Sequence, residues 1–217
     1  MGGGHNNTAD SRGTLIGGGE GNRVSGLFST VSGGSHNIVT YQSSVVGGGS
    51  DNTVGGYSSV VCGGSSNRVL AEYSVIAGGS ENTVTGVNSF IGGGTYNSAF
   101  GVDTAVGGGS SNTVTGAKAV IAGGSNNLAE AFHCAVGGGS KNTVDAASVF
   151  GVVSGGLENT AISSFTVVGK GRRLCTRLRV NTRVHAACLF LTLKGVVNPI
   201  MRVDHLPWYQ AAVTTLR

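Results

Sequence analysis

Apolar residues return in two columns, with a period of 15 residues, along most of this chain. When repeat positions are counted from a recurring asparagine, position 3 holds only Val or Ala and position 10 only Val or Ile. Glycine pairs, from Gly3 and Gly4 to Gly155 and Gly156, precede every asparagine. A strict short period predicts one structural unit stacked on copies of itself. The asparagines that open the repeats are Asn7, Asn22, Asn37, Asn52, Asn67, Asn82, Asn97, Asn112, Asn127, Asn142 and, after a two-residue insertion, Asn159.

The two columns predict strands and not helices. No segment shows the apolar stripe of 3.6-residue period that a helix needs, and glycine pairs in every repeat would break a helix. Valine-rich segments between glycine-rich corners are typical of short strands. We therefore predict an all-β parallel β-solenoid of about eleven coils over residues 1–171, a rod of roughly 50 Å. Residues 172–217 are expected to form a basic C-terminal cap or tail.

Strand alternation predicts which residues face outward. Positions 2 and 4 are largely polar, as at Thr53 and Arg68, and should face water. Position 9 should also face outward, yet it is largely apolar, and position 11 beside it is small. A long outward apolar stripe favours self-association. The alternative is a flattened interior in which positions 9 and 10 are both buried within one chain. The predicted self-association stripe consists of Leu15, Val45, Val60, Val75, Phe90, Val120, Val152 and Val167.

The asparagine column has two structural interpretations. Each asparagine can be a corner residue with left-handed backbone, which asparagine tolerates well. It can instead point inward and form a ladder of amide hydrogen bonds with the coils above and below. Either role is structural, so no ligand is expected at this column.

The half-repeat pattern Asn/Ser-x-Val/Ala-x-Gly occurs at Asn52–Gly56 and Ser89–Gly93. It resembles the YadA-type head of trimeric autotransporter adhesins, and the glycine-rich array is similar to parts of tail-fibre proteins. The resemblance covers about residues 2–171. It implies a left-handed β-roll, a homotrimer, an extracellular or cell- or virion-surface location, and a host-surface protein or glycan as binding partner. Unlike that family, residues 172–217 show no heptads and end in Arg217.

Charge is distributed unevenly along the chain. Its net charge is +4. From Lys170 onward there are nine Lys and Arg residues, and Asp204 is the single acidic residue. A basic tail is compatible with nucleic acid or anionic lipid, but also with a solvated cap. We expect no specific nucleic-acid partner. An apolar run, Ala186 to Leu193, lies within this tail. A mis-assigned reading frame is the alternative origin of the whole tail sequence.

Chemically active residues form no recognisable site. Cys62 and Cys134 occupy different repeat positions about 24 Å apart, beyond disulfide reach. The four cysteines and five histidines lack metal-ligand spacing, so we expect no metal and no cofactor. No apolar stretch is long enough for a transmembrane helix. Met1 to His5 carry neither a basic nor an apolar segment, so no classical signal peptide is expected in this chain.

Three classes of function fit parts of this sequence to different degrees. A structural, adhesive fibre segment agrees with the repeat, the stripe and the resemblance. Ice binding needs outward threonine pairs, which occur only at Thr83/Thr85 and Thr113/Thr115. A glycan-processing enzyme needs paired acids on one face, whereas the acids here scatter over unrelated positions. We predict the fibre segment and no enzyme.

Overall fold

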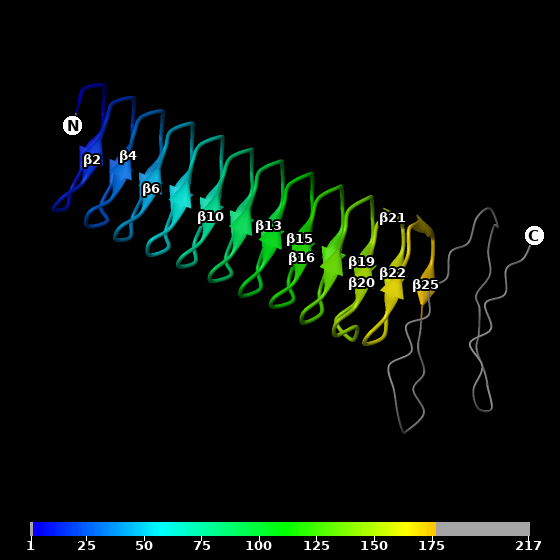
Figure 1. Ribbon diagram of the computed structural model, residues 1–217. Coiled ribbons are helices and arrows are strands. Elements are labelled where there is room, and N and C mark those ends of the chain that lie inside the picture. The colour runs from blue at the N-terminus through cyan, green and yellow to red at the C-terminus, as the bar shows by residue number, and fades with distance from the viewer. Residues whose placement is uncertain (1, 177–217) are drawn as a thin grey trace, which may run out of the picture.

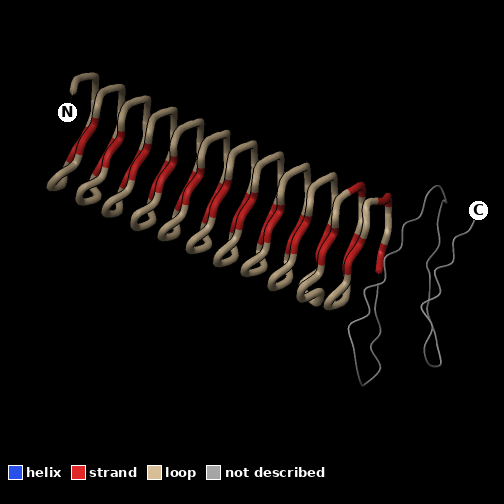
Figure 2. The backbone as a smooth tube through the Cα atoms, in the orientation of Figure 1, coloured by secondary structure: helices blue, strands red, loops and turns tan. Residues whose placement is uncertain are grey.

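The computed structural model describes residues 2–176, which form a single row of stacked coils (Figure 1). Within these residues there is no helix, and every strand is two residues long. Each complete coil contributes one strand to each of two parallel sheets (Figure 2). The predicted parallel β-solenoid of about eleven 15-residue coils is therefore confirmed.

The twelve-stranded sheet contains the strands that carry repeat positions 2 and 3. Its members are β1 (Thr8–Ala9), β3 (Arg23–Val24), β5 (Ile38–Val39), β7 (Thr53–Val54), β9 (Arg68–Val69), β11 (Thr83–Val84), β13 (Ser98–Ala99), β15 (Thr113–Val114), β17 (Leu128–Ala129), β19 (Thr143–Val144), β22 (Thr160–Ala161) and β25 (Cys175–Thr176).

The eleven-stranded sheet contains the strands that carry positions 9 and 10. Its members are β2 (Leu15–Ile16), β4 (Thr30–Val31), β6 (Val45–Val46), β8 (Val60–Val61), β10 (Val75–Ile76), β12 (Phe90–Ile91), β14 (Ala105–Val106), β16 (Val120–Ile121), β18 (Ala135–Val136), β20 (Val152–Val153) and β23 (Val167–Val168). A third, two-stranded sheet pairs β21 (Gly156–Leu157) with β24 (Gly171–Arg172).

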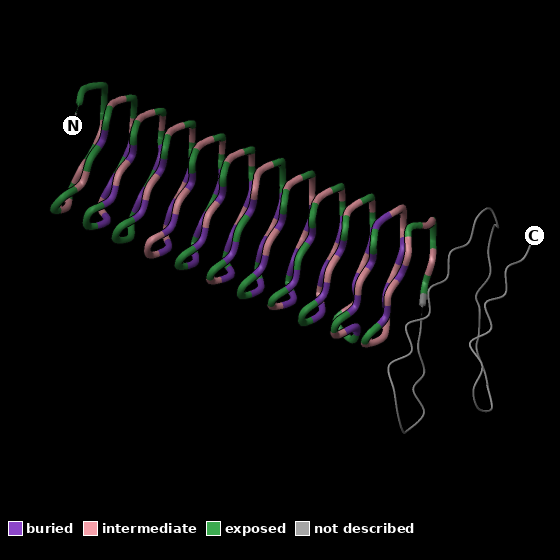
Figure 3. Tube along the Cα trace, in the orientation of Figure 1, coloured by how far each residue is buried: buried purple, intermediate pink, exposed green. Residues whose placement is uncertain are grey.

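The register places like residues on like residues. Val54 pairs with Val69, and Val61 pairs with Ile76, so each apolar column lies directly over itself from coil to coil. Position 3 is fully buried from Val24 onward and position 10 from Ile16 onward. Figure 3 shows this buried line along the inside of the coils, with exposed residues at the corners. One coil alone could not bury these side chains, whereas stacked coils share one continuous core.

The left-handed backbone lies at two corners of the coil, and not at the repeat asparagines. Positive φ angles recur at position 7, as at Ser58, and at position 15, as at Glu81, the residue before the asparagine. This conformation is energetically unfavourable for bulky residues. Position 13 is always glycine: at Gly124, for example, φ is +90° and a Cβ would overlap the carbonyl oxygen of Gly139. The coils therefore approach too closely there for any side chain.

The two-residue insertion lies in the corner between β19 and β20. Asp145 anchors an extra turn there: its Oδ1 accepts a hydrogen bond from Ala147 N, and its carbonyl oxygen accepts one from Ser148 N. The register on both sides is unchanged, because Val144 pairs with Ala161 and Val136 with Val153.

Strand pairing continues beyond residue 171, where we expected the repeat domain to end. β24 and β25 begin a twelfth coil, in which Leu174 takes the position of the asparagine. Leu174 N still donates to Asn159 Oδ1 over 2.9 Å. Arg173 Nε lies 2.6 Å from Glu158 Oε2, and this hydrogen bond holds the pKa of Glu158 below its usual value. Residues 177–217, most of the expected cap or tail, lie outside the described residues.

Candidate self-association surface

The repeat asparagines point into the solenoid and form a continuous ladder. Asn127 Nδ2 donates to Asn112 Oδ1, Gly123 O and Gly139 O, each over 3.0 Å. Its Oδ1 accepts from Asn142 N over 2.9 Å and from Asn142 Nδ2 over 3.1 Å. The same pattern runs from Asn7 to Asn159, and every repeat asparagine from Asn22 to Asn159 is buried. Of the two interpretations of this column, the structure has the inward ladder.

A second polar column, which the sequence reasoning missed, runs through repeat position 8. Ser74 Oγ donates to Gly86 O over 2.9 Å and accepts from Ser89 N over 3.1 Å. Equivalent bonds link the coils from Ser29 to Ser89, and these residues are buried. The sequence shows a recurring serine at position 8. It does not indicate that these serines form a hydrogen-bonded ladder, because Ala119 and Cys134 replace the serine in two coils. Both columns pair buried polar groups inside the coil, and Thr166 Oγ1 in the eleventh coil is the buried side-chain oxygen left without a partner among the described residues.

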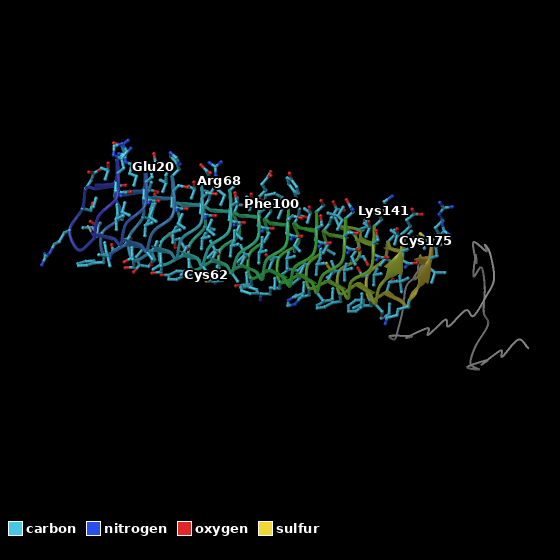
Figure 4. All side chains as sticks on the ribbon, turned by 90° about the horizontal axis from the view of Figure 1, so that it is seen from above. Glu20, Cys62, Arg68, Phe100, Lys141 and Cys175 are labelled. Atoms are coloured by element: carbon cyan, nitrogen blue, oxygen red, sulfur yellow. The ribbon has the colours of Figure 1, made fainter. Side chains whose placement is uncertain are left out.

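The predicted self-association stripe lies on the outer face of the eleven-stranded sheet. Leu15, Phe90 and Val120 are 51%, 43% and 42% exposed, and the other five residues of the stripe are partly exposed. Position 9 is therefore outside the core, and the flattened-interior alternative is wrong. Cys62 at position 11 is exposed beside this stripe. In Figure 4 Cys62 lies on the side of the rod opposite Arg68 and Phe100.

The two outer faces of the rod differ in charge. No residue at positions 9 and 11 of the eleven-stranded sheet is charged in any coil. The outer face of the twelve-stranded sheet carries Arg23, Arg68 and Glu130 among its residues. It also holds the Thr83/Thr85 pair, but Arg68 and the exposed Phe100 lie in the neighbouring coils, so threonine forms no continuous array. The uncharged face is the one suited to burial against another surface.

Position 12 is glycine in every coil up to Gly155 and is Lys170 in the eleventh coil. At some of these positions φ lies outside the left-handed range, and a Cβ added to the backbone would meet nothing within 4 Å; these are Gly18, Gly33, Gly63 and Gly78. No contact within the chain excludes a side chain at these four positions, whereas at Gly48, Gly93 and Gly108 the φ angles of 151°, 144° and 155° themselves favour glycine. A surface that approaches the backbone from outside would explain glycine at the four open positions.

The described residues contain no group of His, Cys, Asp or Glu side chains able to hold a metal ion. Cys62 and Cys134 are both free thiols, and burial raises the pKa of Cys134 to about 11. Among residues 2–176, no helix has the length and apolar character needed to cross a membrane.

Comparison with known proteins adds no family to this picture. No protein-family model matches the chain, and a search of curated proteins finds no match either.

Proposed function

We propose that this chain is a structural segment of a fibre, in which copies pack side by side through the stripe into a trimeric rod for surface display or attachment. The observation that carries the proposal is the uncharged, partly exposed apolar face that runs along the eleven-stranded sheet. An apolar face of this length in contact with water favours association. The open glycines at position 12 support it, because they would let a neighbouring copy approach the backbone closely.

The trimer and the surface location rest on the resemblance to YadA-type heads. Three identical chains around one axis form a closed assembly in which each chain presents the same face inward. Attachment would then use the remaining surfaces of the rod, through many weak contacts multiplied by three chains. In this arrangement the charged outer face of the twelve-stranded sheet would stay in contact with solvent or a receptor.

A charge-insertion pair tests the proposal. Val75→Asp places a carboxylate in the stripe, and Thr83→Asp places one on the outer face of the other sheet, in the next strand along the chain. Sedimentation equilibrium should give three chains for the wild type and for T83D, and a smaller species for V75D. A wild-type chain that stays monomeric and folded at high concentration would sink the proposal, as would equal assembly of both variants.

A second measurement needs no variant. Cys62 is exposed in a single chain, so an alkylating reagent should modify it readily when the protein is dilute. In the assembled fibre the neighbouring copy should cover Cys62 and slow the modification at least tenfold. Equal rates across concentrations that do and do not support assembly would place Cys62, and the stripe beside it, outside the interface.

A further inference from the structure

An exposed aromatic column occupies one corner of the last coils. His133 and Phe150 stack with ring centroids 5.2 Å apart, and Phe150 and Phe165 stack at the same distance. Phe132 meets His133 edge-on at 4.1 Å. Phe150 and Phe165 are 45% and 65% exposed. We call the four residues Phe132, His133, Phe150 and Phe165 the aromatic column.

Three residues of the aromatic column have an energetically unfavourable backbone conformation. His133, Phe150 and Phe165 occupy repeat position 7, with φ angles of 55°, 58° and 57°. Bulky residues seldom adopt this left-handed conformation, which costs about 1–2 kcal/mol. A stacked aromatic pair contributes about 0.5–1.5 kcal/mol, which offsets part of this cost but leaves Phe150 and Phe165 45% and 65% exposed to water. A binding partner that covers the rings would account for their presence.

The location of the column points to a local partner. Position 7 is polar in several middle coils, as at Ser43, Ser58, Asn88 and Asp103. Elsewhere at this corner aromatic rings occur singly, as at Phe28, or as the pair Tyr57 and Tyr73. A continuous stack of rings occurs only in the last coils of the described residues, and a neighbouring copy lying along the whole rod would not need a stack confined to one end. The occupant is therefore expected at the end where the chain leaves the solenoid.

An unpaired hydroxyl marks the same end. Thr166, next to Phe165, takes the role of the position 8 serines and is 2% exposed, yet its Oγ1 has no hydrogen-bond partner. The serines at this position donate to a carbonyl oxygen of the following coil, as Ser74 does to Gly86. The threonines Thr14 and Thr104 instead donate to the carbonyl oxygen three residues earlier in their own coil. At Thr166 that carbonyl oxygen belongs to Ser163 and accepts from Ser148 Oγ over 2.6 Å, and Thr166 Oγ1 stays unpaired among the described residues.

The chain that follows the last complete coil carries an apolar segment of suitable length. Continuing the repeat register would put Arg183 at position 10, where all the complete coils have Val or Ile. The sequence therefore does not support another coil of the same kind. The apolar run Ala186 to Leu193 begins ten residues after Thr176, and ten extended residues span about 33 Å. Coils are spaced at about 4.8 Å, so the run can reach the aromatic column.

We propose that the aromatic column is the docking surface for this chain's own C-terminal segment, which packs on it through the apolar run Ala186 to Leu193. Docking would cover the exposed rings of the aromatic column. The inference does not depend on the proposed self-association, because the aromatic column and the stripe are different surfaces.

Alkylation of Cys188, which lies within the apolar run, tests the docking in the full-length chain. Peptide mapping by mass spectrometry gives the rate for each cysteine separately. We expect Cys188 to react at least tenfold faster in the double variant Phe150→Ala/Phe165→Ala than in the wild type. Phe28→Ala, an exposed aromatic at the same repeat position near the other end, is the matched control and should leave the rate unchanged.

Two further readouts separate docking from its alternatives. Slow alkylation of the buried Cys134 in the double variant shows that the solenoid is still folded. Leu189→Asp, which leaves the solenoid untouched, should release Cys188 by the same factor. The proposal is overturned if Cys188 reacts as a free thiol in the wild type, or at equal rates in wild type and both variants. Protection that appears only at high protein concentration would assign the occupant to another copy and overturn it as well.

Discussion

Replacing one asparagine of the ladder tests what holds the coils together. Asn127 and Asn126 are neighbours in the chain, but Asn127 is 1% exposed and Asn126 is exposed, with a left-handed φ of 54°. Asn127→Ala removes the acceptor of Asn142 N, a buried amide. It also removes the donor to Gly123 O. Leaving a buried donor without a partner costs about 1–3 kcal/mol, and the further lost bonds bring the expected destabilisation to roughly 2–4 kcal/mol.

Asn127→Asp is the sharper variant, because it keeps the shape and changes only one atom. The new carboxylate oxygen would face Asn112 Oδ1, Gly123 O and Gly139 O, all acceptors at the 3.0 Å separation of the present hydrogen bonds. An uncompensated buried charge of this kind costs on the order of 3–5 kcal/mol. The folded state would raise the pKa of the introduced carboxyl above its usual value. The destabilisation should therefore grow as pH rises through this pKa, and shrink below the ordinary aspartate pKa, where both states are protonated.

Denaturant unfolding followed by circular dichroism at pH 7 and pH 4 measures these effects. The matched controls are Asn126→Ala and Asn126→Asp, for which we expect changes below about 1 kcal/mol at either pH. Since a solenoid can lose coils separately, hydrogen exchange of the coils around Asn127 should show the same order of stability. Equal free energies of unfolding for the Asn126 and Asn127 variants would refute the ladder as a source of stability.

Three other predictions concern single positions. Gly124→Ala should lower the free energy of unfolding by more than about 2 kcal/mol, because its Cβ would overlap the next coil, whereas Gly123→Ala should change it by less than about 1 kcal/mol; thermal unfolding of the pair checks this. Ser74→Ala, which leaves Ser89 N without its acceptor, should cost roughly 1–3 kcal/mol in denaturant unfolding. In dilute native protein at pH 8, Cys134 should resist iodoacetamide while Cys62 reacts, because burial raises the pKa of Cys134 to about 11; in urea both should react at similar rates, as followed by mass spectrometry.

Much of this architecture could be predicted because one pattern repeats in every coil. The spacing of Val54 and Val61, copied along the chain, was enough to predict two parallel sheets and their register. The inward or outward direction of Asn52 could not be decided from spacing alone, because both interpretations place an asparagine beside a glycine-rich corner. Burial and hydrogen bonding in three dimensions decide it.

Other features left no clear sequence signal. The left-handed corners at positions 7 and 15 hold residues as different as Phe28, Glu81 and Lys118, so no glycine or asparagine pattern marks them. The start of the twelfth coil was missed because Leu174 replaces the asparagine that defined the period. The backbone amide of Leu174 still donates to Asn159 Oδ1. This hydrogen bond of the ladder therefore requires an asparagine in the preceding coil, but not in the coil that donates the amide. Self-association concerns contacts between chains, and it stays a prediction.

The insertion between β19 and β20 has a consequence for how such a chain can change. Two additional residues enter the coil at one corner, and a local turn around Asp145 accommodates them while the strands on both sides keep their pairing. Length differences at this corner are thus uncoupled from the sheets. Other peptides grafted at the exposed residues Ala146 and Ala147 should be presented outward without shifting the coils, provided that the buried Ser148 stays in place. The corner is therefore a natural point for sequence diversification, and a practical site for displaying an epitope on a regular scaffold.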